Sequence, residues 1–176
     1  MDAQWNRGYV QVYTGEGKGK TTAALGLALR AAGAGLRVLI AQFVKGMHYS
    51  ELDALQRFDD LIDVRQYGRA CFIHGQPSAV DVQAARDGLA EVRQELLSAR
   101  WDVVILDEAN IATHFGLFSV DDLLTVIEER PEGVELVITG RRADPRVIEA
   151  ADLVTEMRAV KHYYQQGVKA RRGIES

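Results

Sequence analysis

The amino-acid sequence predicts an α/β fold in which helices flank a mostly parallel β-sheet. Apolar runs of strand length alternate with stretches of helix length along the chain, which is typical of strands connected through helices. Several runs are apolar at nearly every position, as expected of strands buried on both faces. The length of 176 residues is that of one ordinary domain, so we expect residues 1–176 to form a single P-loop-type domain.

A strand, a glycine-rich loop and a helix open the predicted fold. Residues 8–13 are a short β-rich run that leads into the glycines of residues 15–19. Residues 20–32 are mostly Ala and Leu, which favour a helix, and Gly33 and Gly35 end it. This order is the context in which a phosphate-binding loop is found.

The middle of the chain adds two strands and a helix. Residues 36–43 are apolar almost throughout and predict a buried strand, whereas residues 62–67 alternate and predict a strand nearer an edge. Residues 68–77 show no periodicity and predict a loop. Ser78 and Asp81 then form a predicted capping box. The helix that follows has an apolar face made of Ala85, Leu89, Val92 and Leu96.

The last part of the chain repeats this alternation. Residues 101–106 predict another buried strand, which ends at Asp107 and Glu108. Four more elements are predicted in chain order: a helix capped by Ser119 and Asp122 and ended by Pro131, a strand at 134–139, a short helix at 146–150 and a strand at 153–157.

Composition and charge exclude several classes of protein. Hydrophobic residues make up 47% and charged residues 26% of the chain, which is enough apolar material for a core without disulfides or a structural metal. The net charge of −4 argues against a nucleic-acid partner. The single cysteine, Cys71, fits a reducing compartment. Without a signal peptide or a membrane-length apolar run, we expect a cytoplasmic protein with no membrane partner.

The strongest motif is the loop between the first strand and the first helix. Glycine lets its backbone fold around an anion with the N–H groups inward, and the helix adds the positive end of its dipole. Lys20 supplies a charge for phosphates, and the hydroxyl of Thr21 can bind Mg²⁺. We expect nucleotide contacts from Thr14, Gly15, Glu16, Gly17, Lys18, Gly19, Lys20, Thr21 and Thr22.

Two further features bear on this loop. Thr14 stands where the usual P-loop pattern has its first glycine, so the loop opens differently. Asp107 and Glu108 follow a buried strand, and ligands in open α/β sheets bind at the carboxyl ends of strands. A carboxylate there can hold Mg²⁺ directly or through water, opposite Thr21.

Several stretches spread over nearly the whole chain carry a resemblance to one family. They are Thr14 to Thr22, Gln42-Phe43-Val44-Lys45-Gly46, Leu106-Asp107-Glu108, Ile138-Thr139-Gly140-Arg141, Val160-Lys161-His162 and Gly167 to Glu175. With them, the chain resembles the ATP:corrinoid adenosyltransferases of the cob(I)alamin or cob(I)yrinic acid a,c-diamide type. Thr14, unusual for a P-loop protein, is expected in that family.

The resemblance implies a transferase of cobalamin synthesis or salvage with ATP and a reduced corrinoid as substrates. Cobalt(I) attacks the ribose 5′ carbon of ATP, and tripolyphosphate leaves whole. Lys20, Thr21 and Glu108 are then the expected catalytic residues, and Mg²⁺, held by Thr21 with Asp107 or Glu108, neutralises the departing phosphates. The resemblance also implies an electron donor such as a flavoprotein, and we expect a homodimer.

The corrinoid side departs from the family pattern. Several members carry a Gly-Phe-Thr-Trp stretch that covers the lower face of the corrin, but residues 68–74 here contain Phe72 and no tryptophan. Phe72 is the expected corrin contact, whereas His74 is either a cobalt ligand or a solvated loop residue. Lys45 contacts phosphate or corrin amides, or it lies on the surface. Arg141 is expected to reach the nucleotide, with a surface ion pair as the alternative.

Two other functions share these residues. A small-molecule kinase or nucleoside triphosphatase would use the same loop with Glu108 as a base, and it would release ADP. A non-catalytic corrinoid or nucleotide carrier would bind ATP without consuming it. The sequence leaves open which corrinoid is the substrate.

Overall fold

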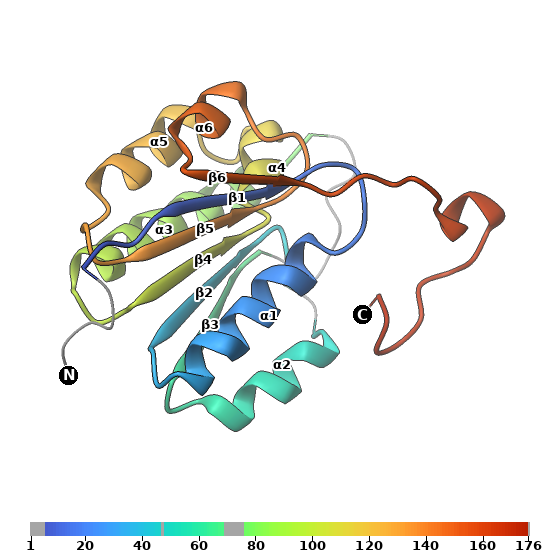
Figure 1. Cartoon of the computed structure of the whole chain (residues 1–176). Coiled ribbons are helices and arrows are strands. Elements are labelled where there is room, and N and C mark those ends of the chain that lie inside the picture. Colours follow the sequence, from blue (N-terminus) through green and yellow to red (C-terminus); the bar gives the residue numbers. More distant parts are fainter. Residues whose placement is uncertain (1–5, 47, 69–75, 176) are drawn as a thin grey trace.

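The computed structural model describes residues 6–46, 48–68 and 76–175, which form an α/β fold (Figure 1). Six strands form one sheet in the order β3-β2-β4-β5-β1-β6, and every neighbouring pair is parallel. The strands are β1 (Val10–Thr14), β2 (Val38–Phe43), β3 (Ile62–Tyr67), β4 (Val103–Asp107), β5 (Glu135–Thr139) and β6 (Leu153–Glu156). The predicted fold class is confirmed, and the sheet of the described chain is parallel throughout.

Helices cover both faces of the sheet (Figure 1). They are α1 (Lys20–Gly33), α2 (Ser50–Leu55), α3 (Ala79–Leu97), α4 (Ala109–His114), α5 (Val120–Glu129) and α6 (Pro145–Ala150), with 3-10 helices at Gln56–Phe58 and Tyr163–Gln166. Helix α1 packs its alanines on one face, where Val38, Ile40 and Ile105 point. Helices α3 to α6 pack on the other, where Leu39, Val104 and Leu106 point. Burial on both faces explains why the central strands read as continuous apolar runs.

Local signals in the sequence located most of these elements. Both capping boxes form, at Ser78 with Asp81 and at Ser119 with Asp122. The alternating run 62–67 is the edge strand β3. The predicted face of α3 is buried. Strands β1, β2, β4 and β5 begin one or two residues later than predicted, and α2 and α4 were not predicted at all.

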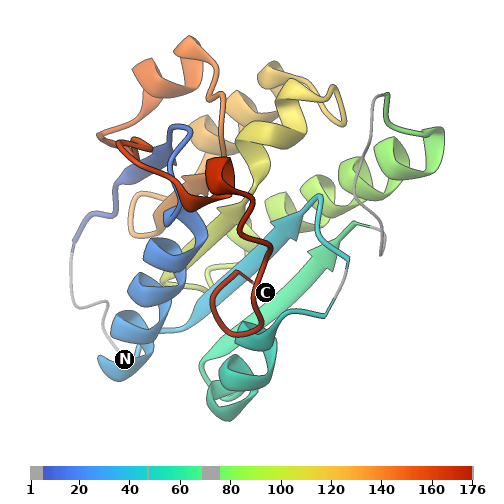
Figure 2. The same cartoon turned by 90° about the vertical axis from the view of Figure 1, so that its right-hand side faces the viewer.

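The parallel arrangement brings the carboxyl ends of all six strands to one edge of the sheet. The P-loop, Lys45 and Gly140 follow β1, β2 and β5 at this edge, and Asp107 is the last residue of β4. The chain after β6, residues 157–175, lies on the same side of the molecule (Figure 1, Figure 2). We call this segment the tail.

Candidate functional site

The P-loop is held against the end of β6 by its glycines. The N–H of Gly17 donates a 2.6 Å hydrogen bond to the carbonyl of Met157. A Cβ atom at Gly15 or Gly17 would lie 2.5 or 2.6 Å from that same carbonyl oxygen, so neither position has room for a side chain. Gly15 and Gly19 also have φ of 96° and 118°, where L-residues are strained. The loop therefore needs glycine for its packing as well as for its curvature.

Lys20 begins α1, and its ammonium group lies within the loop. Its Nζ donates hydrogen bonds of 2.8 and 2.7 Å to the carbonyls of Gly15 and Gly17. Burial, followed by the charge of Arg141, lowers the pKa of Lys20. The position supplies a positive charge at the N-terminal end of α1, where the motif predicts phosphate binding.

Asp107 is fully buried at the end of β4 and accepts four hydrogen bonds. Its Oδ1 accepts from the hydroxyls of Thr21 at 2.8 Å and Thr139 at 2.7 Å. Its Oδ2 accepts from Lys45 Nζ at 2.6 Å and Gln42 Nε2 at 3.2 Å. The structure thus brings Thr21 and Asp107 together, as the sequence predicts.

Lys45 is part of this cluster and is not a surface lysine. Its side chain is only 14% exposed, and Nζ lies 3.4 Å from Thr21 Oγ1 as well as 2.6 Å from Asp107. Burial lowers the pKa of Lys45, but the neighbouring carboxylates of Asp107 and Glu108 outweigh it, so the net shift is upward. The surface alternative is therefore wrong.

Glu108 lies next to the cluster at the start of α4. Its φ of 62° places it in the left-handed region, and its N–H donates a 2.9 Å hydrogen bond to Thr139 Oγ1. Burial and repulsion from Asp107 raise the pKa of Glu108, while Lys45, Lys20 and Arg141 oppose the rise. The residue is thus a carboxyl group with reduced acidity beside the P-loop.

The other predicted nucleotide contacts include exposed residues at the rim of the loop and one buried residue. Glu16 and Arg141 form a 3.6 Å ion pair with side chains 63% and 54% exposed. Thr14 is buried and accepts a 3.4 Å hydrogen bond from the N–H of Ala143. Thr22 is exposed on the first turn of α1.

Lys18 turns outward and contacts the tail. Its Nζ lies 2.8 Å from Glu175 Oε1 and 3.2 Å from the hydroxyl of Tyr163. This contact joins the P-loop to the tail, and 157 positions of sequence separate Lys18 from Glu175. The two lysines of the loop therefore have different partners: Lys20 the loop itself and Lys18 the tail.

Two residues of the cluster were missed by sequence reasoning. One is Gln42, which is fully buried in β2. Its Nε2 donates a hydrogen bond to Asp107, and its Oε1 accepts a 3.1 Å hydrogen bond from Gln66 Nε2. These three residues are register neighbours on β3, β2 and β4. Thr139, the last residue of β5, is the other. The available signal was a polar residue inside an otherwise apolar strand.

Some predicted contacts lie outside the described residues. They are Phe72, predicted to contact the corrin, and His74, predicted to be a cobalt ligand or a solvated residue, and both stay predictions. Gly68, which leads into that segment, packs on Lys45: a Cβ there would lie 2.7 Å from the Lys45 carbonyl oxygen.

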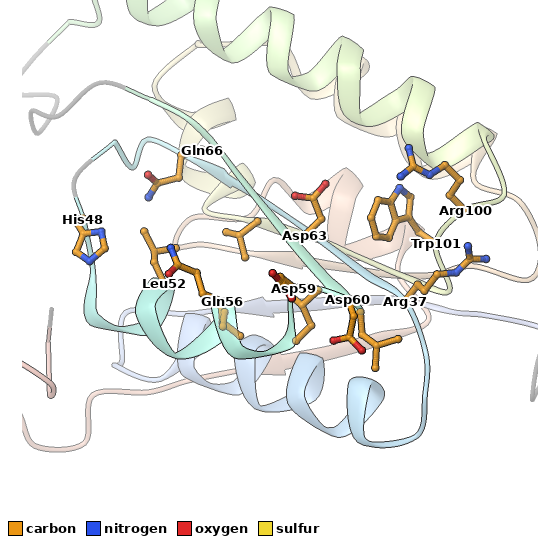
Figure 3. A pocket seen from close by; sticks show the side chains of 14 residues that line it. Arg37, His48, Leu52, Gln56, Asp59, Asp60, Asp63, Gln66, Arg100 and Trp101 are labelled. Atoms are coloured by element: carbon orange, nitrogen blue, oxygen red, sulfur yellow. The ribbon is translucent and has the colours of Figure 1, made fainter.

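A cavity of about 550 Å³ lies away from the P-loop, between α2 and the edge strand β3 (Figure 3). His48 and Gln66 lie at one end, and Arg37 and Trp101 at the other. None of the P-loop residues is in its described lining. Trp101 has a structural role here, since its indole N–H donates a 2.9 Å hydrogen bond to Glu95.

Two absences hold for the part of the chain that the structure describes. Over residues 6–46, 48–68 and 76–175, no helix combines the length and apolar character needed to cross a membrane. Within the same residues, no group of three or more His, Cys, Asp or Glu side chains is placed to bind a metal ion.

Comparison with known proteins assigns the chain to one family. The family model described as ATP:corrinoid adenosyltransferase BtuR/CobO/CobP matches residues 6–176. A corrinoid adenosyltransferase of Pseudomonas aeruginosa is 37% identical over 174 residues, covering 98% of this chain and 86% of that protein. Corrinoid adenosyltransferases of Escherichia coli and Salmonella typhimurium are 36% and 34% identical, each covering 98% of this chain and 88% of the relative. The chain therefore belongs to the ATP:corrinoid adenosyltransferase family.

Proposed function

We propose that the cluster at the carboxyl edge of the sheet binds ATP with Mg²⁺ and presents the ribose 5′ carbon to the cobalt(I) of a corrinoid. Membership of the family makes the chain a transferase that moves the adenosyl group of ATP to a corrinoid in cobalamin synthesis. The kinase or triphosphatase alternative is not favoured. The observation that carries the proposed site is the convergence of Lys20, Thr21 and Asp107 beside the glycine loop.

The polyphosphate is assigned to the loop of residues 14–22. The start of α1 follows the loop directly, and Lys20 adds a full charge within it. As the bond between the 5′ carbon and its oxygen breaks, negative charge grows on the leaving tripolyphosphate. Lys20 then stabilises a leaving group, and no bond between phosphorus atoms and bridging oxygens has to break.

The residues present fit a magnesium ion. Thr21 and Asp107 come from different elements and lie within 2.8 Å of each other, and a cation, the Lys45 ammonium, already contacts both. Mg²⁺ in nucleotide sites typically uses one or two protein ligands together with phosphates. Thr21 and Asp107 would hold it, with Glu108 beside them, and the ion would neutralise charge on the phosphates.

The corrinoid is assigned to the side of Lys45 and Gly68. Gly68 leads into residues 69–75, where the proposal places Phe72 against the lower face of the corrin. Arg141 and Glu16, paired across the rim, would border the nucleotide. A reduced corrinoid needs an electron donor, for which we propose a flavoprotein. A homodimer and a cytoplasmic location complete the proposal.

An anaerobic reaction tests this function. Protein, MgATP and chemically reduced corrinoid are mixed, the visible spectrum is recorded, and the phosphate products are identified by phosphorus NMR. We expect an adenosylated corrinoid and tripolyphosphate in equal amounts. ADP with orthophosphate would support a kinase or hydrolase, and unconsumed ATP would support a carrier.

A further inference from the structure

Lys45 lies where a cation bound by Thr21 and Asp107 would lie. Its Nζ is 2.6 Å from Asp107 Oδ2 and 3.4 Å from Thr21 Oγ1, and its side chain is mostly buried. The ammonium group completes the charge balance of a carboxylate that water does not reach. Mg²⁺ and an ammonium cannot share this position, because two cations in contact within a buried site repel strongly.

The backbone at Lys45 is held in place. Val44, the preceding residue, has φ of 61°, a left-handed conformation that is a real outlier for a β-branched residue. Such strain persists only where the surroundings fix it, and it is concentrated at functional positions. On the other side, Gly68 packs on the Lys45 backbone with no room for a Cβ. A flexible side chain on a fixed backbone can move its charge while the strand end stays in place.

We infer that Lys45 is an internal counter-cation, which occupies the metal position in the nucleotide-free protein and moves to the polyphosphate when MgATP binds. This inference rests on the proposed magnesium site. The carboxylate of Asp107 exchanges one positive partner for another, so it is never buried as an unpaired charge. The released ammonium finds a new partner in the phosphates beside it.

The exchange makes the metal and the nucleotide depend on each other. Free Mg²⁺ has to displace an ammonium that is ion-paired with Asp107 at 2.6 Å, which weakens the binding of the metal. MgATP brings phosphates that accept the displaced ammonium, so it binds with a smaller penalty. Coupling of this kind typically changes an affinity 5- to 150-fold, and it acts equally in both directions.

Two variants test the inference: Lys45→Met, which removes the charge, and Lys45→Gln, which removes the charge but keeps a donor for Asp107. Mn²⁺, observed by electron paramagnetic resonance, serves as the metal probe for the nucleotide-free protein. We expect Mn²⁺ to bind both variants about tenfold more tightly than the wild-type chain. In calorimetry, MgATP should bind them about tenfold more weakly. Arg57→Met, which removes an exposed cation from the Gln56–Phe58 helix, is the matched control and should change neither affinity.

The outcomes separate this inference from the proposed function. Equal Mn²⁺ affinity of wild-type and variant chains would overturn the role of Lys45 and leave the metal site intact. A lack of Mn²⁺ binding in every chain, even with ATP, would overturn the metal site and the inference with it. Neither result touches the product assay for adenosyl transfer. If circular dichroism shows that Lys45→Met is unfolded, Lys45→Gln decides.

Discussion

The hydroxyl of Thr21, on the first turn of α1, donates a 2.8 Å hydrogen bond to Oδ1 of Asp107 at the end of β4, across 86 positions of sequence. This contact exists because β1 and β4 are parallel strands of one sheet and both end at the same edge. It connects the P-loop helix to the carboxylate that four donors surround. The geometry of the proposed metal position is therefore set by the packing of α1 on the sheet.

Thr21→Ala should damage metal use more than folding. The change removes one of two hydroxyl donors to Asp107 Oδ1, and Thr139 remains, so the free energy of unfolding should fall by about 1.5 kcal/mol, the lower end for a hydrogen bond to a charged group. The half-saturating Mg²⁺ concentration should rise at least about tenfold, the loss seen even for residues that only support a ligand. Thr21→Ser keeps the hydroxyl and should retain activity. Equal losses of activity and stability in Thr21→Ala would contradict the assignment.

Gln42→Leu should destabilise the chain through Asp107. A buried hydrogen bond to a charged group contributes about 1.5–3 kcal/mol, and the 3.2 Å distance to Asp107 Oδ2 favours the lower end. Urea denaturation measures the change. The control is Gln11→Leu, which should cost less, because the Gln11 side chain on β1 donates to Glu135 on β5 and is only partly buried. Equal costs would show that Gln42 does not support the carboxylate.

The sequence predicts the fold well where the signals are local. Capping boxes and apolar periodicity involve residues a few positions apart, so α3 and α5 were located correctly and the buried strands to within two residues. Helix α4 was not, because it has only six residues and no side-chain cap. The P-loop motif and the carboxylates at the end of a buried strand also predicted that Lys20, Thr21 and Asp107 lie in one site. Gln42 and Thr139 were missed because their partner, Asp107, lies 65 and 32 positions away and only the folded sheet joins them.

Glu108→Gln should stabilise the nucleotide-free protein at neutral pH. The folded state raises the pKa of Glu108, so folding favours its protonated form. That contribution is fully present below the unfolded pKa of about 4.3 and is lost as the pH rises through the higher folded pKa. The neutral glutamine avoids this loss, so the Tm of Glu108→Gln should exceed that of the wild type at pH about 7. Each kcal/mol gained in the free energy of unfolding should raise the Tm by about 2–4 °C.

The pH series gives the decisive comparison for Glu108. The advantage of Glu108→Gln should shrink as the pH falls and disappear near the unfolded pKa. Glu16→Gln, on the exposed side of the loop, is the control and should leave the melting temperature nearly unchanged at every pH. An advantage of Glu108→Gln that is constant with pH would show that its cause is packing and not charge.

Phe72→Ala should slow the reaction that starts from cobalt(II). If Phe72 covers the lower face of the corrin, it keeps an axial ligand away, and cobalt(II) without that ligand is easier to reduce. Turnover with a weak reductant should therefore fall, while turnover of chemically prepared cobalt(I) should fall less. Phe58→Ala, a partly exposed phenylalanine on the Gln56–Phe58 helix, is the matched control. An equal slowing from both oxidation states would indicate lost binding or misfolding.

Lys20→Ala should lower turnover by about 10²–10³-fold, the usual cost of removing one electrostatic donor from a reacting site. Lys20 is buried within the loop and bonded only to the loop carbonyls of Gly15 and Gly17 in the described structure, so it is free to turn to phosphates that enter. Lys18→Ala is the matched control, because its ammonium is 40% exposed and faces Glu175 of the tail. Turnover of Lys18→Ala should fall far less, and phosphorus NMR should find tripolyphosphate as the product of both variants. Similar losses for the two lysines would mean that neither position alone carries the charge that stabilises the leaving tripolyphosphate.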